Sequence, residues 1–405
     1  MYILVLNSGS SSQKSCVYEI AEALPASPPA PIWEGKIEWE GSTAILRIRG
    51  ADRQEQTEQV ISAERADATR RLLDALTTGP HSALQNRSEI DVVGHRIVNG
   101  GRAYSQPSVI NADVKASIEK MAVFAPLHNR IELEGIRMIE QALGPVPQVA
   151  VFDTGFHRRI PDAAAIYPGP YAWAERGIRR YGFHGINHQY CAERTAQLLR
   201  KKVDDLRLVT CHLGNGCSLA AVRDAHSVDT TMGFTPLDGL MMGTRSGSVD
   251  PGILTFLMRE QNLTGEQLDE VLNKKSGLLG ISGVSSDMRQ IMQAMKQGDA
   301  RAKLAFDIFV HRLRSGIASM VASLGGMDAL VFSAGIGENS PEVRAAACTN
   351  LAFLGLMLDP VRNQSSRGDE EISTQESKVR VLVLRAQEDW AIAKECWRLQ
   401  RGSAT

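Results

Sequence analysis

The chain has almost no net charge, no paired cysteines and no long uninterrupted apolar run, and each absence excludes a class of protein. Its 45 Lys and Arg residues balance 46 Asp and Glu residues, so no overall field favours nucleic acid or an anionic membrane. Its six cysteines contain no CxxC pair, and a chain of 405 residues needs no disulfide to build a core. We therefore expect buried thiols, no nucleic-acid partner and no membrane partner.

Two apolar segments are candidates for a targeting signal or a membrane span, and neither has the sequence pattern of one. Residues 1–6 lead directly to the polar Asn7 without a basic segment, so they are not expected to be a secretory signal. The stretch 316–337 is interrupted by three serines and by Asp328, so it is no membrane span. We expect a cytoplasmic protein of two or three domains.

Short aliphatic runs alternate with longer helical periodicities, which predicts an α/β fold. We expect strands at residues 2–6, 14–18, 44–48, 147–152, 206–212, 218–222, 329–332 and 379–384. We expect helices at 64–78 and 131–143, each ending at a Gly-Pro pair, and helices beginning after Asp250, Thr264 and Ser340. These three residues have side chains that cap helices. The proline-rich segment 21–35 is expected to be a loop.

Two similar hairpins lie half a chain apart. Residues 4–18 and 208–222 each run from an apolar strand through a turn of Gly, Ser or Asn into a second strand. The likeness suggests a duplicated domain, although such turns also occur in unrelated hairpins. The first turn, followed by Lys14, could direct N–H groups and hydroxyls at phosphate oxygens. It is not a Walker loop, because GxxxxGK[ST] is absent.

Two further segments follow apolar strands. Residues 333–341, SAGIGENSP, combine glycines with the start of a helix, which suits an anion or is simply a tight turn. Asp153 follows the strand 149–152, where open α/β sheets place ligand-binding residues. Its carboxylate could bind a metal ion or handle a proton, or it could only cap the next segment.

Two arginines and a histidine pair also stand out. Arg96 and Arg245 are flanked by glycines and apolar residues, so we expect them to be partly buried and paired with an anion. His184 and His188 have the spacing of two metal ligands on one helix face. No HExxH motif, cysteine cluster or third ligand accompanies them, so contact of a single histidine with a ligand is the favoured interpretation.

Taken together, these strings resemble the acetate kinase family, within the superfamily of acetate and sugar kinases, heat-shock chaperones and actin. The matching segments run in order along the chain: LVLNSGSSSQK at 4–14, VGHRIVNGG at 93–101, APLHN at 125–129, VFDTGFH at 151–157, YGFHG at 181–185, HLGNG at 212–216, DTTMGFTPLDGLMMGTRSG at 229–247, SGLLGISG at 276–283, SDMR at 286–289 and AGIGENS at 334–340.

The resemblance implies two duplicated actin-like (ribonuclease H-like) domains with ATP and substrate in the cleft between them. Residues 1–153, with a C-terminal helix at 389–405 packing back on them, would form the substrate side. Residues 154–388 would bind the nucleotide. The implied reaction is reversible, Mg-dependent phosphoryl transfer from ATP to acetate, giving acetyl phosphate and ADP, in a homodimer. The alternatives are a propionate or other short-chain carboxylate kinase, and an actin-like ATPase module that makes no acyl phosphate.

The resemblance also implies a role for individual residues. Catalysis would fall to Asp153, His184 and Arg245. Substrate binding would fall to Arg96, Val98, Leu127, Phe183 and Pro236. The nucleotide would contact Lys14, His212, Leu213, Gly214, Asn215, Gly216, Asp287, Met288, Arg289, Gly335, Ile336, Gly337, Glu338 and Asn339. Asn7 and Glu388 would be associated with Mg²⁺, for which Mn²⁺ is a possible substitute.

The chain departs from the family pattern at several positions. Asn99 replaces the histidine of HGG, Arg130 the proline after APLHN, and Gly155 the alanine of FDTAFH. Ile186 and Asn187 replace Thr-Ser of FHGTSH, Ser248 replaces an aspartate, and residues 386–389 replace TNEE. These changes bear on rate, substrate range and the dimer contact, and they leave the expected reaction class intact. Glu388 lies within one of them.

Overall fold

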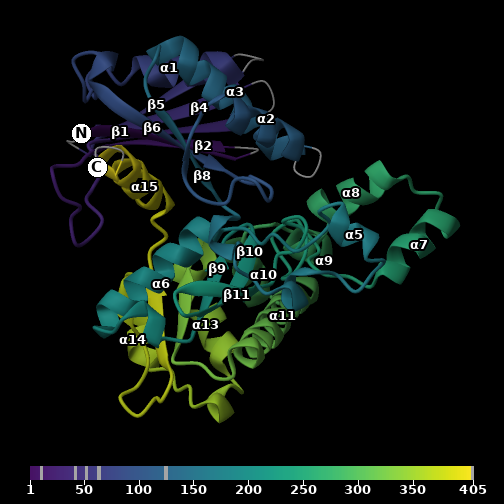
Figure 1. Ribbon diagram of the computed structural model, residues 1–405. Helices are drawn as coiled ribbons and strands as arrows, with labels where there is room; N and C mark the ends of the chain where they lie inside the picture. Colours follow the sequence, from purple (N-terminus) through teal and green to yellow (C-terminus); the bar gives the residue numbers. More distant parts are fainter. Residues whose placement is uncertain (10–11, 41–42, 51–52, 62–64, 123–125, 403–405) are drawn as a thin grey trace. The chain divides into compact units, whose positions relative to one another are not determined.

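In the computed structural model the chain divides into two units. The first unit comprises Met1–Gly155 and Gln387–Thr405, and the second unit comprises Phe156–Ala386. The structure describes residues 1–9, 12–40, 43–50, 53–61, 65–122 and 126–402. The domain limits expected from the sequence, 1–153 and 154–388, lie two residues from these junctions. Each unit is built on one β-sheet (Figure 1).

The sheet of the first unit has the strand order β5-β4-β3-β2-β1-β6-β8-β7. Its strands are β1 (Tyr2–Ser8), β2 (Ser12–Glu19), β3 (Trp33–Glu40), β4 (Thr43–Arg49), β5 (Glu55–Ile61), β6 (Ile90–Ile97), β7 (Ser108–Val109) and β8 (Gln148–Phe152). Strand β1 pairs antiparallel with β2 and parallel with β6, and β6 pairs parallel with β8. The carboxyl ends of β1, β6 and β8 therefore lie at one edge of the sheet.

The sheet of the second unit has the order β11-β10-β9-β12-β14-β13. Its strands are β9 (Leu208–Leu213), β10 (Cys217–Arg223), β11 (His226–Thr230), β12 (Ala329–Ser333), β13 (Glu370–Glu371) and β14 (Arg380–Leu384). Strands β11, β10 and β9 are antiparallel, β9, β12 and β14 are parallel, and β13 is a short antiparallel edge. Strands β3-β2-β1-β6-β8-β7 repeat this pattern, so the expected α/β class and duplication are confirmed.

Helices cover both faces of the first sheet. They are α1 (Arg65–Asp74), α2 (Ala112–Met121), α3 (Pro126–Leu143) and α15 (Glu388–Gly402), with a 3₁₀ turn at Arg87–Glu89. Helices α1 and α3 bury Leu72 and Ile139 in one core with Trp33 and Leu46 of the sheet. Helix α15, yellow in Figure 1, returns from the end of the chain to pack against β1, β2 and β6. One face of the first sheet is thus covered by a helix that is distant in the sequence.

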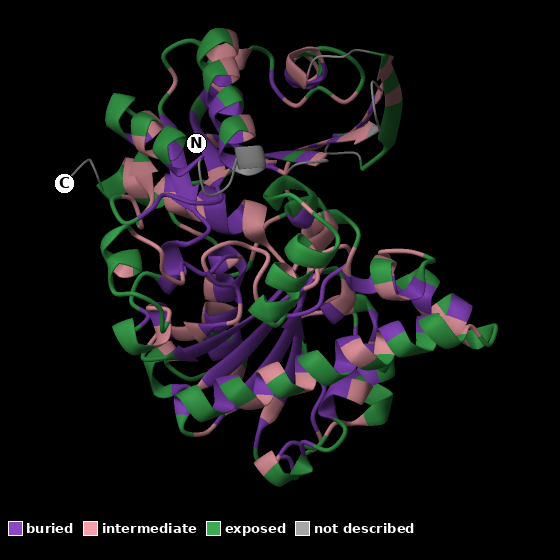
Figure 2. Ribbon diagram, turned by 90° about the vertical axis from the view of Figure 1, so that its right-hand side faces the viewer, coloured by how far each residue is buried: buried purple, intermediate pink, exposed green. Residues whose placement is uncertain are grey.

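The second unit carries more helices. They are α4 (Asp162–Ala165), α5 (Ala172–Glu175), α6 (Gly185–Leu199), α7 (Pro251–Glu260), α8 (Gly265–Lys274), α9 (Gly277–Ser282), α10 (Met288–Lys296), α11 (Ala300–Leu324), α12 (Ala334–Asn339), α13 (Pro341–Cys348) and α14 (Pro360–Ser365), with 3₁₀ turns at Gly155–His157, Val203–Asp205 and Ala352–Leu354. Helix α11 packs on β9, β10 and β11, and α6 on β9, β12 and β14. The strands between them are largely buried (Figure 2). Within the described residues, no helix has the length and apolarity that crossing a bilayer requires.

All eight expected strands are present, and others were missed. The missed strands are β3, β5, β6 and β11, together with the short edges β7 and β13. Strand β3 begins at Trp33, so the expected loop 21–35 is wrong in its last three residues. The helix expected at 64–78 ends at Asp74, and Glu64 lies outside the described residues. The helix expected at 131–143 begins earlier, at Pro126.

Two of the three expected caps are confirmed. The carboxylate of Asp250 accepts from the N–H of Gly252 at 2.8 Å, and Thr264 and Gln267 form the reciprocal capping box. The helix expected after Ser340 does begin at Pro341, but the expected cap is wrong, because Ser340 lies between the short helices α12 and α13 and its side chain makes no capping bond. All six cysteines are buried thiols, as expected.

Candidate functional site

In the first unit, two neighbouring parallel strands bring Arg96 and Asp153 together. Arg96 lies near the end of β6, and Asp153 follows β8, where its N–H donates to Ile97 O at 2.8 Å. Nη2 of Arg96 donates to Oδ2 of Asp153 at 2.8 Å; the arginine side chain is 14% exposed and the carboxylate fully buried. Burial alone would lower the pKa of Arg96, but the charges of Asp153, Glu388 and Glu132 together outweigh it, and the pKa is raised. The expected burial and anion pairing of Arg96 are confirmed.

A buried glutamate that the sequence reasoning missed supports the neighbouring Val98. The N–H of Val98 donates to both carboxylate oxygens of Glu132, at 3.1 Å each, and Glu132 lies on α3. Burial raises the pKa of Glu132 to about 8, although the positive charge of Arg96 opposes the shift. Leu127 also lies on α3, and its side chain is outside the described part of the structure. The side chain of Asn99 accepts from Gly101 N at 2.8 Å, so this departure holds the turn after Val98.

The hairpin β1–β2 and the start of α15 form a second polar group in the first unit. Asn7 and Lys14 are partners across the hairpin. Nδ2 of Asn7 donates to Glu388 at 3.1 Å and to Asp389 at 3.0 Å. Burial raises the pKa of Asp389, while the charge of Lys14 opposes the shift. Sequence reasoning missed Asp389, although two consecutive acids at a helix start were a usable signal. Ser10 and Ser11 of the hairpin turn lie outside the described residues.

Oxygen donors dominate this second group, which suits a hard cation such as Mg²⁺. Within the described residues, no group of three or more His, Cys, Asp or Glu side chains could hold a metal ion alone. Magnesium usually takes one or two carboxylates together with phosphate oxygens and water. The Glu388 and Asp389 carboxylates and the amide oxygen of Asn7 fit that partial ligand set.

In the second unit, His184 is the N-cap residue of α6 and lies in the left-handed backbone region, with φ of 56°. A residue with a Cβ is uncommon there, and such strain concentrates at functional sites. The ring of His184 stacks on that of His212, with centroids 4.0 Å apart. His188, one helical turn further on, is fully buried, and burial holds its pKa well below the usual value. His188 is therefore a neutral core histidine.

The glycine turn between β9 and β10 lies against two of the expected catalytic side chains. A Cβ atom placed on Gly216 would be 3.3 Å from Nε2 of His184 and 3.5 Å from Nη1 of Arg245. Nη1 of Arg245 also donates to the carbonyl of Pro236 at 3.1 Å. An imidazole, a guanidinium and a glycine backbone thus converge within this unit. Leu213 is fully buried, so only its backbone is available to a ligand.

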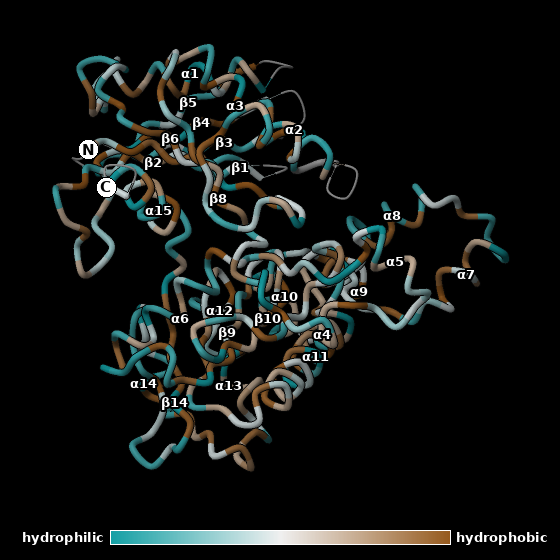
Figure 3. The backbone as a smooth tube through the Cα atoms, viewed as in Figure 1, coloured by the Kyte–Doolittle hydropathy of each residue, from teal (hydrophilic) through white to brown (hydrophobic). Residues whose placement is uncertain are grey.

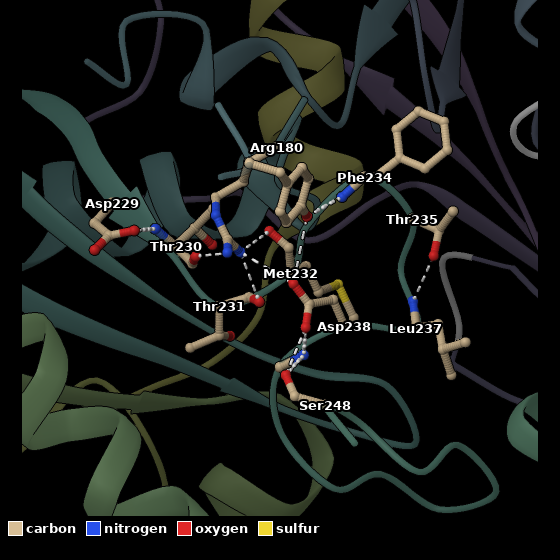
Figure 4. Close-up of polar contacts among 12 residues, drawn as sticks. Arg180, Asp229, Thr230, Thr231, Met232, Phe234, Thr235, Leu237, Asp238 and Ser248 are labelled. Atoms are coloured by element: carbon tan, nitrogen blue, oxygen red, sulfur yellow. Dashed lines mark hydrogen bonds and ion pairs between the residues drawn. The ribbon is translucent and has the colours of Figure 1, made fainter. Parts of the chain in front are cut away.

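The loop that carries Pro236 is fixed by polar contacts (Figure 4). Nη1 of Arg180 donates to the carbonyls of Thr230, Thr231 and Met232, at 3.0 Å each. At the other end of the loop, the hydroxyl of Ser248 donates to the carboxylate of Asp238 at 2.5 Å. An aspartate at position 248 would face this carboxylate with like charge. The departure to serine therefore turns a repulsion into a hydrogen bond.

The remaining expected nucleotide residues lie at helix starts. Asp287 caps α10 and pairs with Arg289 at 2.6 Å, and this hydrogen bond lowers the pKa of Asp287. Met288 is buried, so its side chain is committed to the core. Gly335–Asn339 belong to α12, where Glu338 accepts from Ala386 N at 2.8 Å. Phe183 is buried directly before His184.

Comparison with known proteins gives full-length matches. The model of the family described as "Acetokinase family" matches residues 2–394. The chain is 57% identical over 402 residues to the acetate kinase of Trichormus variabilis, covering 98% of this chain and 99% of that protein. The solved acetate kinase of Porphyromonas gingivalis is 39% identical, with a TM-score of 0.89 over 97% of this chain and 98% of its own. A propionate kinase from Francisella tularensis is 37% identical, with the same TM-score and the same two coverages.

Proposed function

The chain belongs to the acetokinase family, and on that premise we propose that it is an acetate kinase. It transfers a phosphoryl group reversibly from ATP to the carboxylate of acetate, giving acetyl phosphate and ADP. Its two units have the duplicated actin-like fold of that family. The observation that carries the proposal is the convergence of His184 and Arg245 on the glycine turn at Gly216.

The chemistry of the acceptor explains why these donors are needed. Acetate is a carboxylic acid with a pKa of roughly 4 to 5, like Asp and Glu side chains, so it is already ionised at neutral pH. No strong general base is required. The obstacle is the approach of one anion to another, and it is met by donors around the planar phosphoryl group in transit. Arg245 supplies charge there and His184 supplies an N–H.

On the acetate side, Arg96 binds the carboxylate and Asp153 holds Arg96 in place. Nη2 of Arg96 is committed to Asp153, whereas its buried Nε–H has no hydrogen-bond partner among the described residues. A buried donor left unpaired is costly, and a bound carboxylate would satisfy it. From the family resemblance we also assign Val98, Leu127, Phe183 and Pro236 to the binding of the methyl group. A pocket of this kind discriminates one methylene by about 1–3 kcal/mol, so propionate should be a poorer substrate rather than an excluded one.

The nucleotide is bound by Lys14 and by the turns at 212–216, 287–289 and 335–339, mainly through backbone N–H groups. Asn7, Glu388 and Asp389 are the oxygen donors that would hold Mg²⁺, or Mn²⁺ in its place. When bound, the cation neutralises charge on the β- and γ-phosphates of ATP. Six buried thiols support a reducing compartment, and we place the reaction in the cytoplasm.

Trapping of acyl phosphate with hydroxylamine tests the proposal. Mg-ATP is supplied with acetate, propionate, butyrate or no acid, and both ADP and acyl hydroxamate are measured. Acetate-dependent hydroxamate that exceeds the propionate product is the expected result. Preference for propionate would identify a propionate kinase, and ADP release without any hydroxamate would identify an ATPase module.

The protein is also proposed to be a homodimer, with α7 at its interface. Within the described residues α7 buries no side chain, and Ile253, Phe256 and Met258 are each about half exposed. Figure 3 shows much of this helix in the brown of hydrophobic residues. Patches of this kind mark contact surfaces. Light scattering after size exclusion should give twice the 44.2 kDa chain mass for the wild type and a single chain for Phe256→Glu. A monomeric wild type would contradict the proposal.

A further inference from the structure

The stacked rings of His184 and His212 are each held at Nδ1 by a buried hydrogen-bonding side chain. Nδ1 of His184 is 2.8 Å from the hydroxyl of Ser218, and Nδ1 of His212 is 2.9 Å from Nδ2 of Asn187. Strand register places Ser218 and Ser333 on either side of His212 in the sheet. Nε2 of His184 faces the glycine turn at Gly216, and Nε2 of His212 lies near Gly214.

The partner of His212 determines which of its nitrogens carries the proton. Asn187 is fully buried and donates through Nδ2 to His212 at 2.9 Å and to the hydroxyl of Ser333 at 3.3 Å. Its amide oxygen accepts from the thiol of Cys191 at 3.8 Å. An amide N–H only donates, so Nδ1 of His212 must accept. The proton of the neutral ring therefore lies on Nε2.

A chain of hydroxyl and imidazole groups leads to the same result for His184. Nδ1 of His188 lies 2.7 Å from the hydroxyl of Thr210, whose other acceptor, the carbonyl of Ala220, is 3.5 Å away. The 3.5 Å contact with Ala220 exceeds the usual O–H···O range, so we assign the hydroxyl proton of Thr210 to the contact with Nδ1 of His188. Nε2–H of His188 then donates to Ser218 at 2.8 Å, and Ser218 donates to Nδ1 of His184. The proton of neutral His184 is again on Nε2.

We propose that Asn187 and Ser218 are positioning residues that hold His212 and His184 as neutral rings with the proton on Nε2. Both rings then present an N–H donor to phosphoryl oxygens, and this part of the inference rests on the proposed function. Two imidazolium rings stacked at 4.0 Å would repel each other and the guanidinium of Arg245 beside them. Neutral donors avoid this repulsion, so the positive charge of this cluster comes from Arg245.

The proton positions can be read directly by nitrogen NMR on the full chain labelled with ¹⁵N-histidine. Long-range proton–nitrogen correlations distinguish the two neutral tautomers from imidazolium. His184→Gln and His212→Gln assign the two signals among nine histidines. Both residues should show the Nε2–H tautomer from about pH 6.5 to about pH 9. An Nδ1–H tautomer or an imidazolium in this range, for either ring, would overturn the proposal. The readout needs no turnover, so it stands apart from the hydroxamate assay.

Asn187→Asp reverses the polarity of the contact while keeping its shape. The carboxylate would draw a proton onto Nδ1 of His212, so the ring is expected to become imidazolium at low pH and Nδ1–H once neutral. The KM for ATP should then stay near the wild-type value at about pH 6 and rise at least roughly tenfold by about pH 9. Within the described residues, the ring of His188 lies near that of His212 and the guanidinium of Arg245 lies beside the same glycine turn as His184; this variant changes neither residue.

Gln197→Glu is the matched control, because it adds the same charge to an exposed position of the same helix α6. It should leave both histidine signals and the pH dependence of KM as in the wild type. A KM for ATP in Asn187→Asp that does not change with pH, in a folded protein, would show that Asn187 does not govern His212.

Discussion

The guanidinium groups of Arg96 and Arg245 lie in different surroundings. Arg96 lies on a central strand, and its Nη2 is held by the fully buried Asp153. Arg245 lies on a loop, is half-buried and donates to the carbonyl of Pro236 beside Gly216. The first arrangement suits a ground-state contact with a carboxylate. The second suits charge that develops during transfer.

Alanine variants of the two arginines should therefore differ in which steady-state parameter, kcat or KM, they change. Arg245→Ala is expected to lower kcat by about 10²–10³, the usual loss for one transition-state donor, with a smaller change in the KM for acetate. Arg96→Ala should chiefly raise the KM for acetate. Arg223→Ala, which removes an exposed arginine paired with Asp224, is the control and should change neither. A normal kcat in Arg245→Ala would refute its transition-state role.

Glu132 makes the stability of the first unit depend on pH. The pKa of its carboxyl is about 8 in the folded protein, above the usual value near 4.5, because the group is buried. Its favourable contribution to the free energy of unfolding is complete at pH values below the pKa of the group in the unfolded chain. This contribution is lost as the pH rises through about 8. Each pKa unit corresponds to about 1.4 kcal/mol, so the loss amounts to a few kcal/mol.

Glu132→Gln removes this ionisation and keeps an oxygen that can accept from Val98 N. The Tm of the variant relative to the wild type should increase between about pH 5 and about pH 9. Glu134→Gln, on the exposed side of the same helix, controls for the loss of a charge. A Tm difference that is constant across this range would mean that Glu132 does not titrate there.

At the scale of elements, the sequence predicted the strands that are plainly aliphatic and missed the one that carries Arg96. Strand β6 contains Gly94, His95 and Arg96, and these residue types are not typical of a buried strand. Their presence is explained by distant packing: a Cβ on Gly94 would lie 2.6 Å from both Cys396 and Ile392 of α15, and His95 bonds to Gln148. No local pattern reveals these partners.

The same limit applied to the candidate site. Motifs identified Arg96, Asp153, His184 and the glycine turns, because these residues lie in recognisable strings. The buried residues that support the site are far from their partners in the sequence, so only the folded chain brings them together. Glu132 bonds to Val98, Ser218 to His184 and Asn187 to His212. Asn187 was recognised as a departure from the family pattern, and the structure was needed to show that it bonds to His212.

Helix α13 holds α12, the turn proposed above to bind the nucleotide, through one buried arginine. Arg344 donates to the carbonyls of Gly337 and Glu338 at 2.8 Å each, and to the side chain and carbonyl of Asn363. Arg344→Met would leave these acceptors unpaired, at about 1–3 kcal/mol for each one that stays buried. We expect a lower Tm and a higher KM for ATP with the KM for acetate unchanged. Arg362→Met, at an exposed position of α14, should show neither effect. Equal effects on both KM values would contradict the assignment.

At the scale of the whole molecule, the two units differ in how the chain builds them. The second unit is one continuous segment, whereas the first includes Gln387–Thr405, and helix α15 of this segment covers its sheet. Trp390 of α15 is buried with its ring edge-on to Tyr18, and Ile392 and Cys396 are fully buried against β6. Burial of each such apolar side chain contributes about 1.5–3 kcal/mol. Loss of α15 should therefore remove much of the stability of the first unit.

Fragments test this dependence. Residues 156–386 expressed alone should unfold cooperatively in thermal circular dichroism, whereas residues 1–155 alone should lack a cooperative transition and regain one when a peptide of residues 387–405 is added. In the full chain, Gly94→Val should reproduce the defect, because its side chain would collide with Cys396 and Ile392. Gly135→Ala on α3 is the control, since a Cβ there meets no atom within 4 Å. If residues 1–155 melted cooperatively without the peptide, the first unit would not need α15 to fold. The kcat of a chain ending at residue 386 would then show whether Glu388 and Asp389 are needed for phosphoryl transfer rather than for folding.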